Sequence, residues 1–308
     1  MKAYGFSRHG GPEVQEHLDL AVPTPMGGEI RIAVRAAGVN PADHKIRSGA
    51  MGDALREGLP VPMGREAAGV VTAVGPDVTG FAVGDEVFGT VAPASGAFAE
   101  EALLTARATA HKPAALSWHH AAVLPVAAAT AWDGLAQLDL RAGQTLLVNG
   151  VGGGVGLVAA QLGRDRGIPV FGTAREDKRA VVEAQGVTLV PSGDGVVDAV
   201  KAMLPDGVHA VLDLVGGAPL GQLTALVRSP EAIVTAVDPQ TAERIGARWI
   251  ARSSEPAAVL DALAALVVEG KVDPHVVEVR PLAEAEAAVA AVETGRPHGK
   301  VVVEVTSG

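Results

Sequence analysis

Short apolar runs alternate with helical patterns between about Ser117 and Lys271. Five runs predict strands, at 144–150, 169–174, 187–192, 210–216 and 231–237. Helical patterns follow them, beginning near Gly154, Glu176, Gly193, Ala218 and Glu255. Strands that alternate with helices of this length indicate βαβ units, so this region is expected to form a parallel sheet covered by helices.

The flanking regions follow a different pattern. Residues 1–118 are rich in Gly and Pro, and turn residues separate their short β-branched segments, such as 29–39 and 67–75. This pattern predicts a compact antiparallel β domain. A final β-prone run at 299–305 resembles the first region. We therefore predict a discontinuous arrangement, in which 1–118 and 272–308 form one domain and 119–271 forms the other.

Composition narrows the class of protein. The chain has 308 residues, a formal net charge of −10 and no cysteine. The acidic balance argues against a nucleic-acid partner. The absence of cysteine excludes disulfides, thiolate metal sites and cysteine nucleophiles. The N-terminus has no signal-peptide core and no apolar run reaches membrane-spanning length. We expect a cytoplasmic protein that does not bind membranes.

A glycine cluster follows the first strand of the alternating region, in LLVNGVGGGVGLVAAQLG at 146–163. Unpaired amides at a helix N-terminus, together with the helix dipole, favour a pyrophosphate. The usual G-x-G-x-x-G is altered, because its three positions hold Val151, Gly153 and Gly156. A plain tight turn is the alternative, but the position between strand and helix favours dinucleotide binding. The expected cofactor-binding residues here are Gly153, Gly154, Val155 and Gly156.

The end of the second strand indicates which dinucleotide binds. Sites for NAD place Asp or Glu there, whereas sites for NADP place positive charge. The chain reads FGTAREDKR at 171–179. We predict that Arg175 and Lys178 surround the 2′-phosphate of NADPH and that Thr173 donates a hydroxyl hydrogen bond. The alternative is that both cations are solvated helix residues.

Several motifs in a fixed order resemble the medium-chain dehydrogenase/reductase superfamily, and within it the zinc-free quinone oxidoreductase (zeta-crystallin-like) group. They are AAGVNPADHKIRSG, GREAAGVVTAVGPDVTGFAVGDEVFG, LPVAAATAWDGL, LLVNGVGGGVGLVAAQLG, DLVGG and GRPHGKVVV. The resemblance implies an α/β fold with two parts. A GroES-like β domain is expected at 1–118 and 272–308, and a Rossmann domain with a doubly wound parallel sheet at 119–271.

The resemblance also implies where a catalytic zinc would bind. Zinc-dependent relatives carry ligands where this chain has Asn40, Arg65 and Val126, and none of these residues is a zinc ligand. We interpret Glu66 as a structural ion-pair partner. We predict no metal site.

Without zinc, the chemistry implied by the resemblance is hydride delivery from NADPH to a quinone or an α,β-unsaturated carbonyl. The expected catalytic residues are Asn40, as an amide donor, Asp43, which fixes the loop, and Lys45, which donates a proton or stabilises an oxyanion. Bacterial quinone reductases of the group tend to have tyrosines where this chain has Lys45 and Met51. The only tyrosine is Tyr4, so tyrosine-assisted quinone binding is not expected.

Further cofactor-binding residues carry over from the same resemblance. They are Thr130, Val215, Gly216, Val237, His298 and Lys300. Relatives often place a tyrosine near the adenine where this chain has Pro191-Ser192. The run ARWIARS at 247–253 is apolar and β-prone, and we predict a homodimer that extends a sheet through it.

Three functions remain open. The first is an NADPH-dependent quinone or enone reductase. The second is an enoyl-reductase-like tailoring enzyme of a biosynthetic pathway, and the third is an NADP(H)-binding protein with little catalysis. The identity of the acceptor is expected to lie in the loops at 48–62, 90–98 and 238–250.

Overall fold

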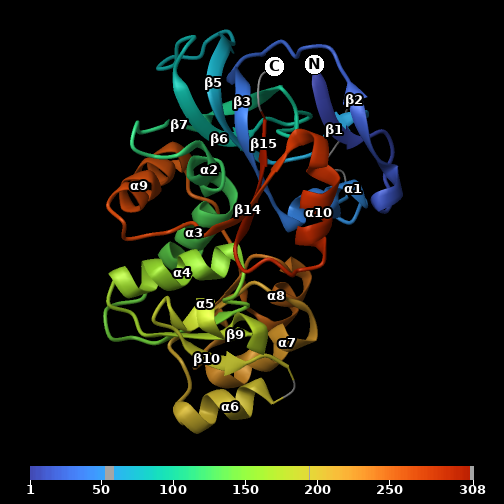
Figure 1. Ribbon diagram of the computed structural model, residues 1–308. Coiled ribbons are helices and arrows are strands. Elements are labelled where there is room, and N and C mark those ends of the chain that lie inside the picture. Colours follow the sequence, from blue (N-terminus) through green and yellow to red (C-terminus); the bar gives the residue numbers. More distant parts are fainter. Residues whose placement is uncertain (53–58, 194, 306–308) are drawn as a thin grey trace. The chain divides into compact units, whose positions relative to one another are not determined.

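The computed structural model describes residues 1–52, 59–193 and 195–305 (Figure 1). The chain divides into two compact units. Unit 1 consists of Met1–Val126, Glu255–Val268 and His275–Gly308, and unit 2 of Ala127–Ser254 and Glu269–Pro274. Both units are therefore assembled from separated stretches of chain. The unit limits differ from the predicted domain limits at 119–126 and 255–268, which the sequence placed with the Rossmann region, and at 272–274, which it placed with the β domain.

Unit 1 is mainly antiparallel β-structure. Its elements are β1 (Lys2–Phe6), η1 (Pro12–Val14), β2 (Gln15–Asp19), β3 (Glu29–Val39), α1 (Pro41–Arg47), β4 (Val61–Pro62), β5 (Glu66–Val74), β6 (Glu86–Val91), β7 (Glu101–His111), α2 (Trp118–Ala121), α9 (Pro256–Val268), β14 (Val276–Pro281), η6 (Leu282–Glu284), α10 (Ala285–Glu293) and β15 (Lys300–Glu304). One sheet has the order β2-β1-β4, and the other has the order β14-β15-β3-β5-β6-β7. Strand β3 also pairs with β7, which closes four strands on one another. The predicted β domain is confirmed.

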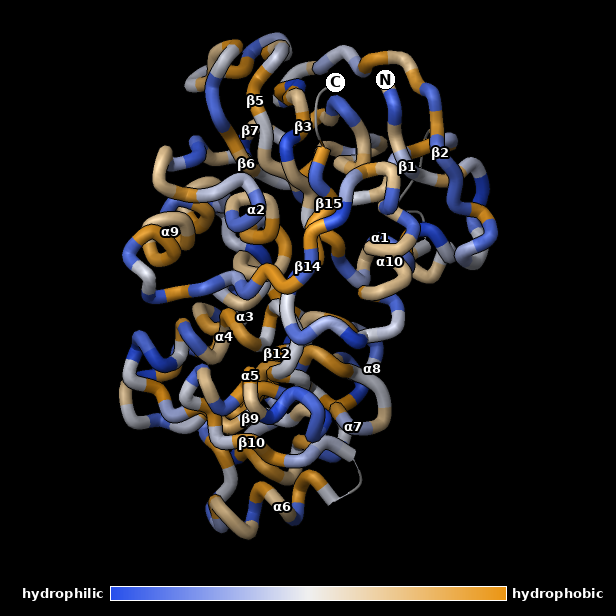
Figure 2. The backbone as a smooth tube through the Cα atoms, in the orientation of Figure 1, coloured by the Kyte–Doolittle hydropathy of each residue, from blue (hydrophilic) through white to orange (hydrophobic). Residues whose placement is uncertain are grey.

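The central strand of this unit shows why the sequence folds in this way. Along β3, Ile30, Ile32 and Val34 are buried while the residues between them are partly exposed, which is the period-two pattern of a strand with one buried face. Helix α9 lies against β7, although they are far apart in sequence (Figure 1). Figure 2 shows α9 largely in hydrophobic colours and β2 largely in hydrophilic ones.

Unit 2 alternates strands and helices. Its elements are α3 (Ala129–Leu138), β8 (Leu146–Asn149), α4 (Gly154–Asp165), β9 (Val170–Ala174), η3 (Glu176–Lys178), α5 (Arg179–Glu183), β10 (Thr188–Pro191), α6 (Val196–Met203), β11 (Ala210–Asp213), α7 (Gly217–Gln222), η4 (Leu223–Leu226), η5 (Pro230–Ala232), β12 (Ile233–Thr235), α8 (Pro239–Ile245) and β13 (Arg248–Trp249). The sheet is parallel, in the order β10-β9-β8-β11-β12-β13. This is the doubly wound order of a Rossmann sheet. The predicted parallel sheet is confirmed, and each predicted strand is found.

The segment between the two regions is one helical run, in which the π-helical turn η2 (Leu124–Ala128) joins α2 to α3. The run Trp118–Leu138 is the one helix in the described part of the chain that is long and apolar enough to cross a membrane, so the expectation that no apolar run reaches this length is not met. Its apolar window is 78% buried inside the protein, as in the core helix of a soluble protein.

Candidate functional site

The glycine turn after β8 brings a helix N-terminus to the carboxyl edge of the parallel sheet. Gly150 has a φ of +91°, which a residue with a side chain rarely adopts. Val151 replaces the first glycine of the usual motif, and its side chain packs on Gly172 of β9, where a Cβ would lie 2.4 Å from it. A Cβ at Gly156 would lie 2.5 Å from the Val151 Cα. The turn therefore accepts a valine because the facing strand supplies a glycine.

The same turn fits the pyrophosphate of a nicotinamide dinucleotide. Gly153 is the N-cap of α4, and a Cβ there would meet only Gly150 O, at 3.9 Å. The first amides of α4 have no partner within the helix, so the helix end is open to an anion. The cofactor-binding roles of Gly153, Gly154, Val155 and Gly156 stay predictions.

Thr173 is positioned to brace this turn. Its hydroxyl donates to Asn149 Oδ1 at 2.7 Å and accepts the Gly150 N–H at 3.0 Å, and the residue is 1% exposed. The hydroxyl proton is already used within the fold. To form the predicted hydrogen bond with a cofactor phosphate, the Thr173 hydroxyl would have to give up its hydrogen bond to Asn149 Oδ1.

The two predicted cations near the 2′-phosphate differ in their surroundings. The Arg175 side chain is 52% exposed and lies 3.4 Å from the Asp177 carboxylate. Lys178 is buried, and its Nζ donates to Gly152 O at 3.0 Å. Burial lowers the pKa of Lys178, as does the nearby charge of Arg175. The structure thus places Arg175 at the surface and the Lys178 ammonium on the glycine turn.

Asp213 was not among the predicted site residues, yet it lies at the centre of what we term the aspartate network: Asp213, Asn149, Thr173 and Thr235. The Asp213 carboxylate is fully buried and accepts from Asn149 Nδ2 and Thr235 Oγ1, each at 2.7 Å. It also accepts the Gly216 N–H at 3.0 Å. An acidic residue ending an apolar strand, inside the DLVGG motif, was the available signal.

The aspartate network spans the ends of β9, β8, β11 and β12 and positions the loops that follow them. Val215 and Gly216 donate their N–H groups to Asp213, and Val237 donates its N–H to Thr235 Oγ1 at 3.3 Å. Val215 is 55% exposed at this edge. Thr130, a further predicted cofactor residue, is buried on α3. The roles predicted for Thr130, Val215, Gly216 and Val237 stay predictions.

A second buried polar group lies in unit 1, and we term it the lysine–glutamate cluster: Lys300, Glu66, Asn40 and Asp43. Lys300 Nζ donates to Asn40 Oδ1 at 2.6 Å, to Glu66 Oε1 at 3.0 Å and to Val39 O at 3.0 Å. Asn40 Nδ2 donates to Glu66 Oε1 at 2.8 Å. The ion pair expected for Glu66 is confirmed. Lys300 and the half-buried His298 belong to unit 1, and their cofactor roles stay predictions.

This cluster does not fit a catalytic metal. The Glu66 carboxylate is fully buried and also accepts the Val126 N–H at 2.7 Å, so the lysine, the amide and this backbone amide engage both of its oxygens. Within the residues that the structure describes, no three His, Cys, Asp or Glu side chains gather to hold a metal. The side-chain ammonium group of Lys300 therefore supplies the positive charge beside Glu66.

Asn40 and Asp43 begin α1 and are committed to the fold. The Asn40 amide uses its oxygen and its Nδ2 within the cluster. Asp43 accepts the Asn40 N–H at 2.7 Å, while its other oxygen is buried without a hydrogen-bond partner among the described residues. Burial raises the pKa of Asp43 to about 7, although the Asn40 amide, Lys300 and Arg65 oppose the shift. These contacts favour a positioning role for both residues.

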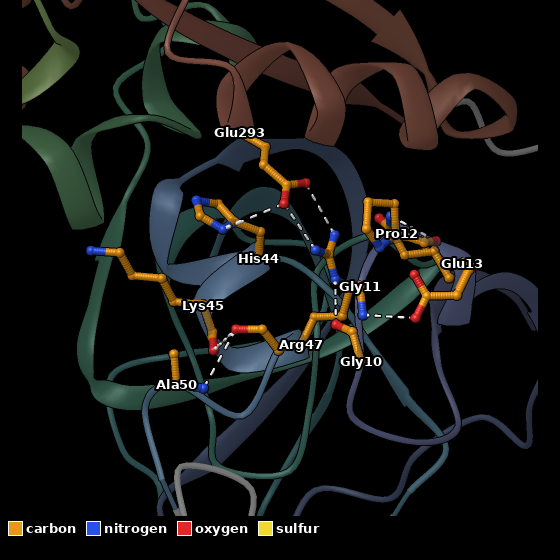
Figure 3. A network of polar contacts seen from close by, with 11 residues as sticks. Gly10, Gly11, Pro12, Glu13, His44, Lys45, Arg47, Ala50 and Glu293 are labelled. Atoms are coloured by element: carbon orange, nitrogen blue, oxygen red, sulfur yellow. Dashed lines mark hydrogen bonds and ion pairs between the residues drawn. The ribbon is translucent and has the colours of Figure 1, made fainter.

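Lys45 lies on the same helix and is the accessible cation of this group. Figure 3 shows its side chain pointing away from the polar network of Arg47 and Glu293. In that network, the buried Arg47 binds the α10 residue Glu293 at 3.0 and 3.3 Å and Gly10 O at 3.2 Å. Lys45 Nζ has no ion-pair or hydrogen-bond partner in the described ranges. The network thus fixes α1 and leaves the Lys45 ammonium available.

Of the loops expected to recognise the acceptor, 48–62 contains residues 53–58, which lie outside the described residues.

Comparison with family models identifies two regions. Residues 26–114 match the alcohol dehydrogenase GroES-like domain, and residues 185–303 match the zinc-binding dehydrogenase family. Among curated proteins, human quinone oxidoreductase is 33% identical over 233 residues, which cover 74% of this chain and 70% of the relative. The spectinabilin polyketide synthase protein NorB of Streptomyces orinoci is 36% identical over 293 residues. This chain spans 90% of its own length in that match but only 13% of NorB.

Solved structures agree with the family matches. The quinone oxidoreductase of Coxiella burnetii is 29% identical, with a TM-score of 0.89 and 99% coverage of both chains. Mycobacterial Rv1454c, solved as a complex with NADPH, is 28% identical with a TM-score of 0.86 and covers 99% of this chain and 100% of its own.

Proposed function

The chain belongs to the medium-chain dehydrogenase/reductase superfamily as an oxidoreductase related to the quinone oxidoreductases, and we propose that it uses NADPH to reduce a quinone or an α,β-unsaturated carbonyl without a metal ion. The family binds a nicotinamide cofactor, and the glycine turn of this chain fits one. The quinone oxidoreductase relatives support the choice of acceptor class.

One observation carries the metal-free part of the proposal, the contact between Lys300 and Glu66. Lys300 Nζ lies 3.0 Å from Glu66 Oε1. The lysine therefore pairs with the carboxylate that a metal ion would need as a ligand. Without a Lewis acid in this cluster, nothing there polarises an alcohol for hydride removal. An acceptor that is already electrophilic needs no such activation.

The cofactor supplies a hydride when it is bound. The glycine turn and the first amides of α4 would hold its pyrophosphate, and the aspartate network would keep their loops in place. Negative charge develops on the acceptor oxygen as hydride arrives, and we assign its stabilisation to the Lys45 ammonium. Transfer of one hydride and one proton reduces the acceptor by two electrons, and Lys45 is the proposed proton donor.

Cofactor choice gives the direct test of this function. A guanidinium–phosphate contact contributes about 1.5–3 kcal/mol, so Arg175→Ala should weaken NADPH by roughly 10–150-fold at about 1.4 kcal/mol per factor of ten. NADH lacks the phosphate and should be almost unaffected. Ala174→Asp should go further, because a carboxylate repels the phosphate and accepts the ribose hydroxyls of NADH. The measurement is kcat/KM for both cofactors, and a wild type that prefers NADH would contradict the proposal.

An enoyl reductase of a biosynthetic pathway is the second candidate, and the match to NorB over 90% of this chain favours it. Turnover with NADPH on a panel of quinones, free enones and enoyl thioesters separates the two. A preference for thioesters supports the second candidate. Binding of NADPH without turnover on any of them supports the third, a cofactor-binding protein with little catalysis.

We also propose that the protein is a cytoplasmic homodimer. Strand β13 is at the edge of the unit 2 sheet, and Trp249 on it is 45% exposed. An edge strand with an exposed aromatic side chain favours pairing with a second copy. Light scattering at micromolar concentration should give twice the mass of the chain, and a monomeric mass would contradict the prediction.

A further inference from the structure

Residues 91–97, which we term the 91–97 loop, belong to one of the loops expected to recognise the acceptor. The loop lies across the start of β5, because the Val91 N–H donates to Arg65 O and the Ala97 N–H donates to Gly64 O, each at 3.1 Å. Gly64 has a φ of +91°, and a Cβ there would lie 3.1 Å from the Ala97 Cβ. Backbone contacts therefore fix both ends of the loop.

The middle of the 91–97 loop is a strained turn. Ala94 has a φ of +59°, which a residue with a side chain rarely adopts. Pro93 and Ala94 are exposed, whereas Ser95 is buried and its Oγ accepts the Leu103 N–H at 3.0 Å. A residue in this conformation persists only where its surroundings hold it. The turn therefore depends on contacts from outside the loop.

Arg65 supplies such contacts. Its Nη1 donates to Ser95 O at 3.3 Å and its Nη2 donates to Val91 O at 3.5 Å. The two carbonyl groups stand on either side of the exposed turn. A guanidinium carries its donors in a rigid planar fork, so one side chain bridges both carbonyls. Arg65 thus connects the two limbs of the turn that contains Ala94.

A small cavity lies beside Arg65 in the same unit. Asp43, Arg65 and Ser95 line it together with apolar residues that include Ile46 and Val61, and its volume is about 10 Å³. This volume is about that of one water molecule. Asp43 is 2% exposed, and its Oδ1 has no hydrogen-bond partner among the described residues. A water molecule in the cavity would have this oxygen as one partner and the guanidinium as another.

The electrostatics agree with two groups that face one cavity. Burial lowers the pKa of Arg65, and the nearby Asp43 carboxyl group opposes this shift. A guanidinium has five N–H groups, of which the loop carbonyls use two. The remaining N–H groups can donate to a water molecule, which can in turn donate to the Asp43 carboxyl oxygen.

We propose that Arg65 is a positioning residue for the acceptor, which fixes the 91–97 loop and is itself held by the Asp43 carboxyl group through one buried water molecule. The proposal rests on the proposed function, because it assigns this loop to acceptor binding. All of these residues belong to unit 1, whereas the glycine turn belongs to unit 2. Loss of the Arg65 contacts should therefore affect the acceptor and not the cofactor.

Steady-state kinetics with NADPH and equilibrium titration test this separation. Arg65→Met removes both hydrogen bonds to the loop and should raise KM for the acceptor by about tenfold, which corresponds to about 1.4 kcal/mol. A loss of this kind, which is equal in the ground state and the transition state, leaves kcat nearly unchanged. The affinity for NADPH should not change. Arg65→Lys keeps the charge but cannot bridge both carbonyls, so it should recover part of the loss.

Hydrogen exchange tests the loop contacts without turnover. Arg65→Met should speed exchange in peptides that cover 91–97 and leave peptides of β8 unchanged. Asp43→Leu should act in the same direction, and the double variant should show little more than the larger single effect, because both residues act in one chain of contacts. Arg107→Met is the matched control, since Arg107 is an exposed arginine on β7 of the same unit, and it should change neither exchange nor KM.

Thermal unfolding of each variant verifies that the fold is retained, and Arg65→Lys replaces Arg65→Met if the latter unfolds. Unchanged exchange at 91–97 in the folded variant overturns the role of Arg65, and an equal loss of NADPH affinity overturns its assignment to the acceptor. A crystal structure of the wild type should show one water molecule in contact with Asp43 and Arg65, and a direct ion pair in its place overturns that link. A wild type that reduces no acceptor contradicts the proposed function, while the exchange measurement still decides whether Arg65 fixes the loop.

Discussion

The two units compensate a fully buried carboxylate in different ways. In the lysine–glutamate cluster of unit 1, Glu66 faces the Lys300 ammonium. In the aspartate network of unit 2, Asp213 has no ion-pair partner among the residues that the structure describes, and it accepts hydrogen bonds from an amide, a hydroxyl and backbone N–H groups. The negative charge of Glu66 is compensated by a single positive charge, whereas that of Asp213 is compensated by the dipoles of several hydrogen-bond donors.

The difference indicates what each group is suited for. A buried ion pair leaves a large unpaired charge when one partner is lost. When several neutral donors hold a carboxylate, removal of any one of them costs less stability than removal of an ion-pair partner. Each of these donors, however, belongs to a different strand end or loop. We therefore expect the lysine–glutamate cluster to control stability and the aspartate network to control the geometry of the cofactor loops.

The largest effect is expected from Lys300→Met. This variant leaves Glu66 buried and unpaired, at a cost of about 3–5 kcal/mol. Adding Glu66→Gln removes the orphaned charge and should restore at least half of the loss, as measured by urea denaturation. Lys2→Met, which removes the exposed pair with Asp19, is the control and should leave the midpoint unchanged. Equal effects of Lys300→Met and Lys2→Met would contradict the comparison.

The next effect concerns pH and Asp43. Burial raises the pKa of this carboxyl from 3.8 to about 7, so the folded state holds a proton that the unfolded state has released between these values. The resulting stabilisation is full below the unfolded pKa and is lost as pH rises through the folded one. At 1.36 kcal/mol per unit, the loss between pH 4 and 7 is at most about 4 kcal/mol. Asp43→Asn should remove this pH dependence from the unfolding curve, and parallel pH profiles for both proteins would show the assignment to be wrong.

Asp213→Asn should have a smaller effect on stability and a clear one on cofactor binding. The new side chain has an NH₂ group where the carboxylate oxygen accepted hydrogen bonds, so donors face a donor. This should lower the free energy of unfolding by about 1–3 kcal/mol. Release of Gly216 and Asn149 should weaken NADPH and NADH alike in equilibrium titrations. Asp198→Asn, on the exposed face of α6, is the control. Unchanged dinucleotide affinity in a destabilised Asp213→Asn protein would limit the network to a structural role.

The smallest effect is expected from metal removal. Since Lys300 supplies the positive charge beside Glu66, prolonged chelation should leave turnover unchanged. Metal analysis of the purified protein accompanies the assay. Stoichiometric zinc together with activity lost on chelation would contradict the metal-free proposal.

Patterns local to one segment predicted much of this molecule. The apolar runs ending at Asn149 and Asp213 identified parallel strands because a buried strand needs little more than a short apolar run bounded by turns. The glycine turn was found in the same way. The sequence also identified Glu66 as an ion-pair partner.

Features that depend on distant contacts were not predictable. Helix α9 is apolar over most of its surface, so its pattern did not reveal that it packs on β7. Lys178 and Arg175 look alike in sequence, and only the fold shows that Lys178 is buried against Gly152 O while Arg175 is exposed. Asp213 was overlooked because its donors come from strands that meet only in the folded sheet.

The pairing of β3 has a consequence for synthesis of the chain. Its last residues pair with β15, so that Val39 faces Val301 and Ala36 faces Glu304. As the polypeptide emerges from the ribosome, that edge of β3 has no partner until the chain reaches residue 304. Residues 127–254 form most of unit 2 without any later strand. Since loop closure over such a separation is slow, the region translated second is expected to complete its fold first, while the nascent β3 edge remains a target for chaperones.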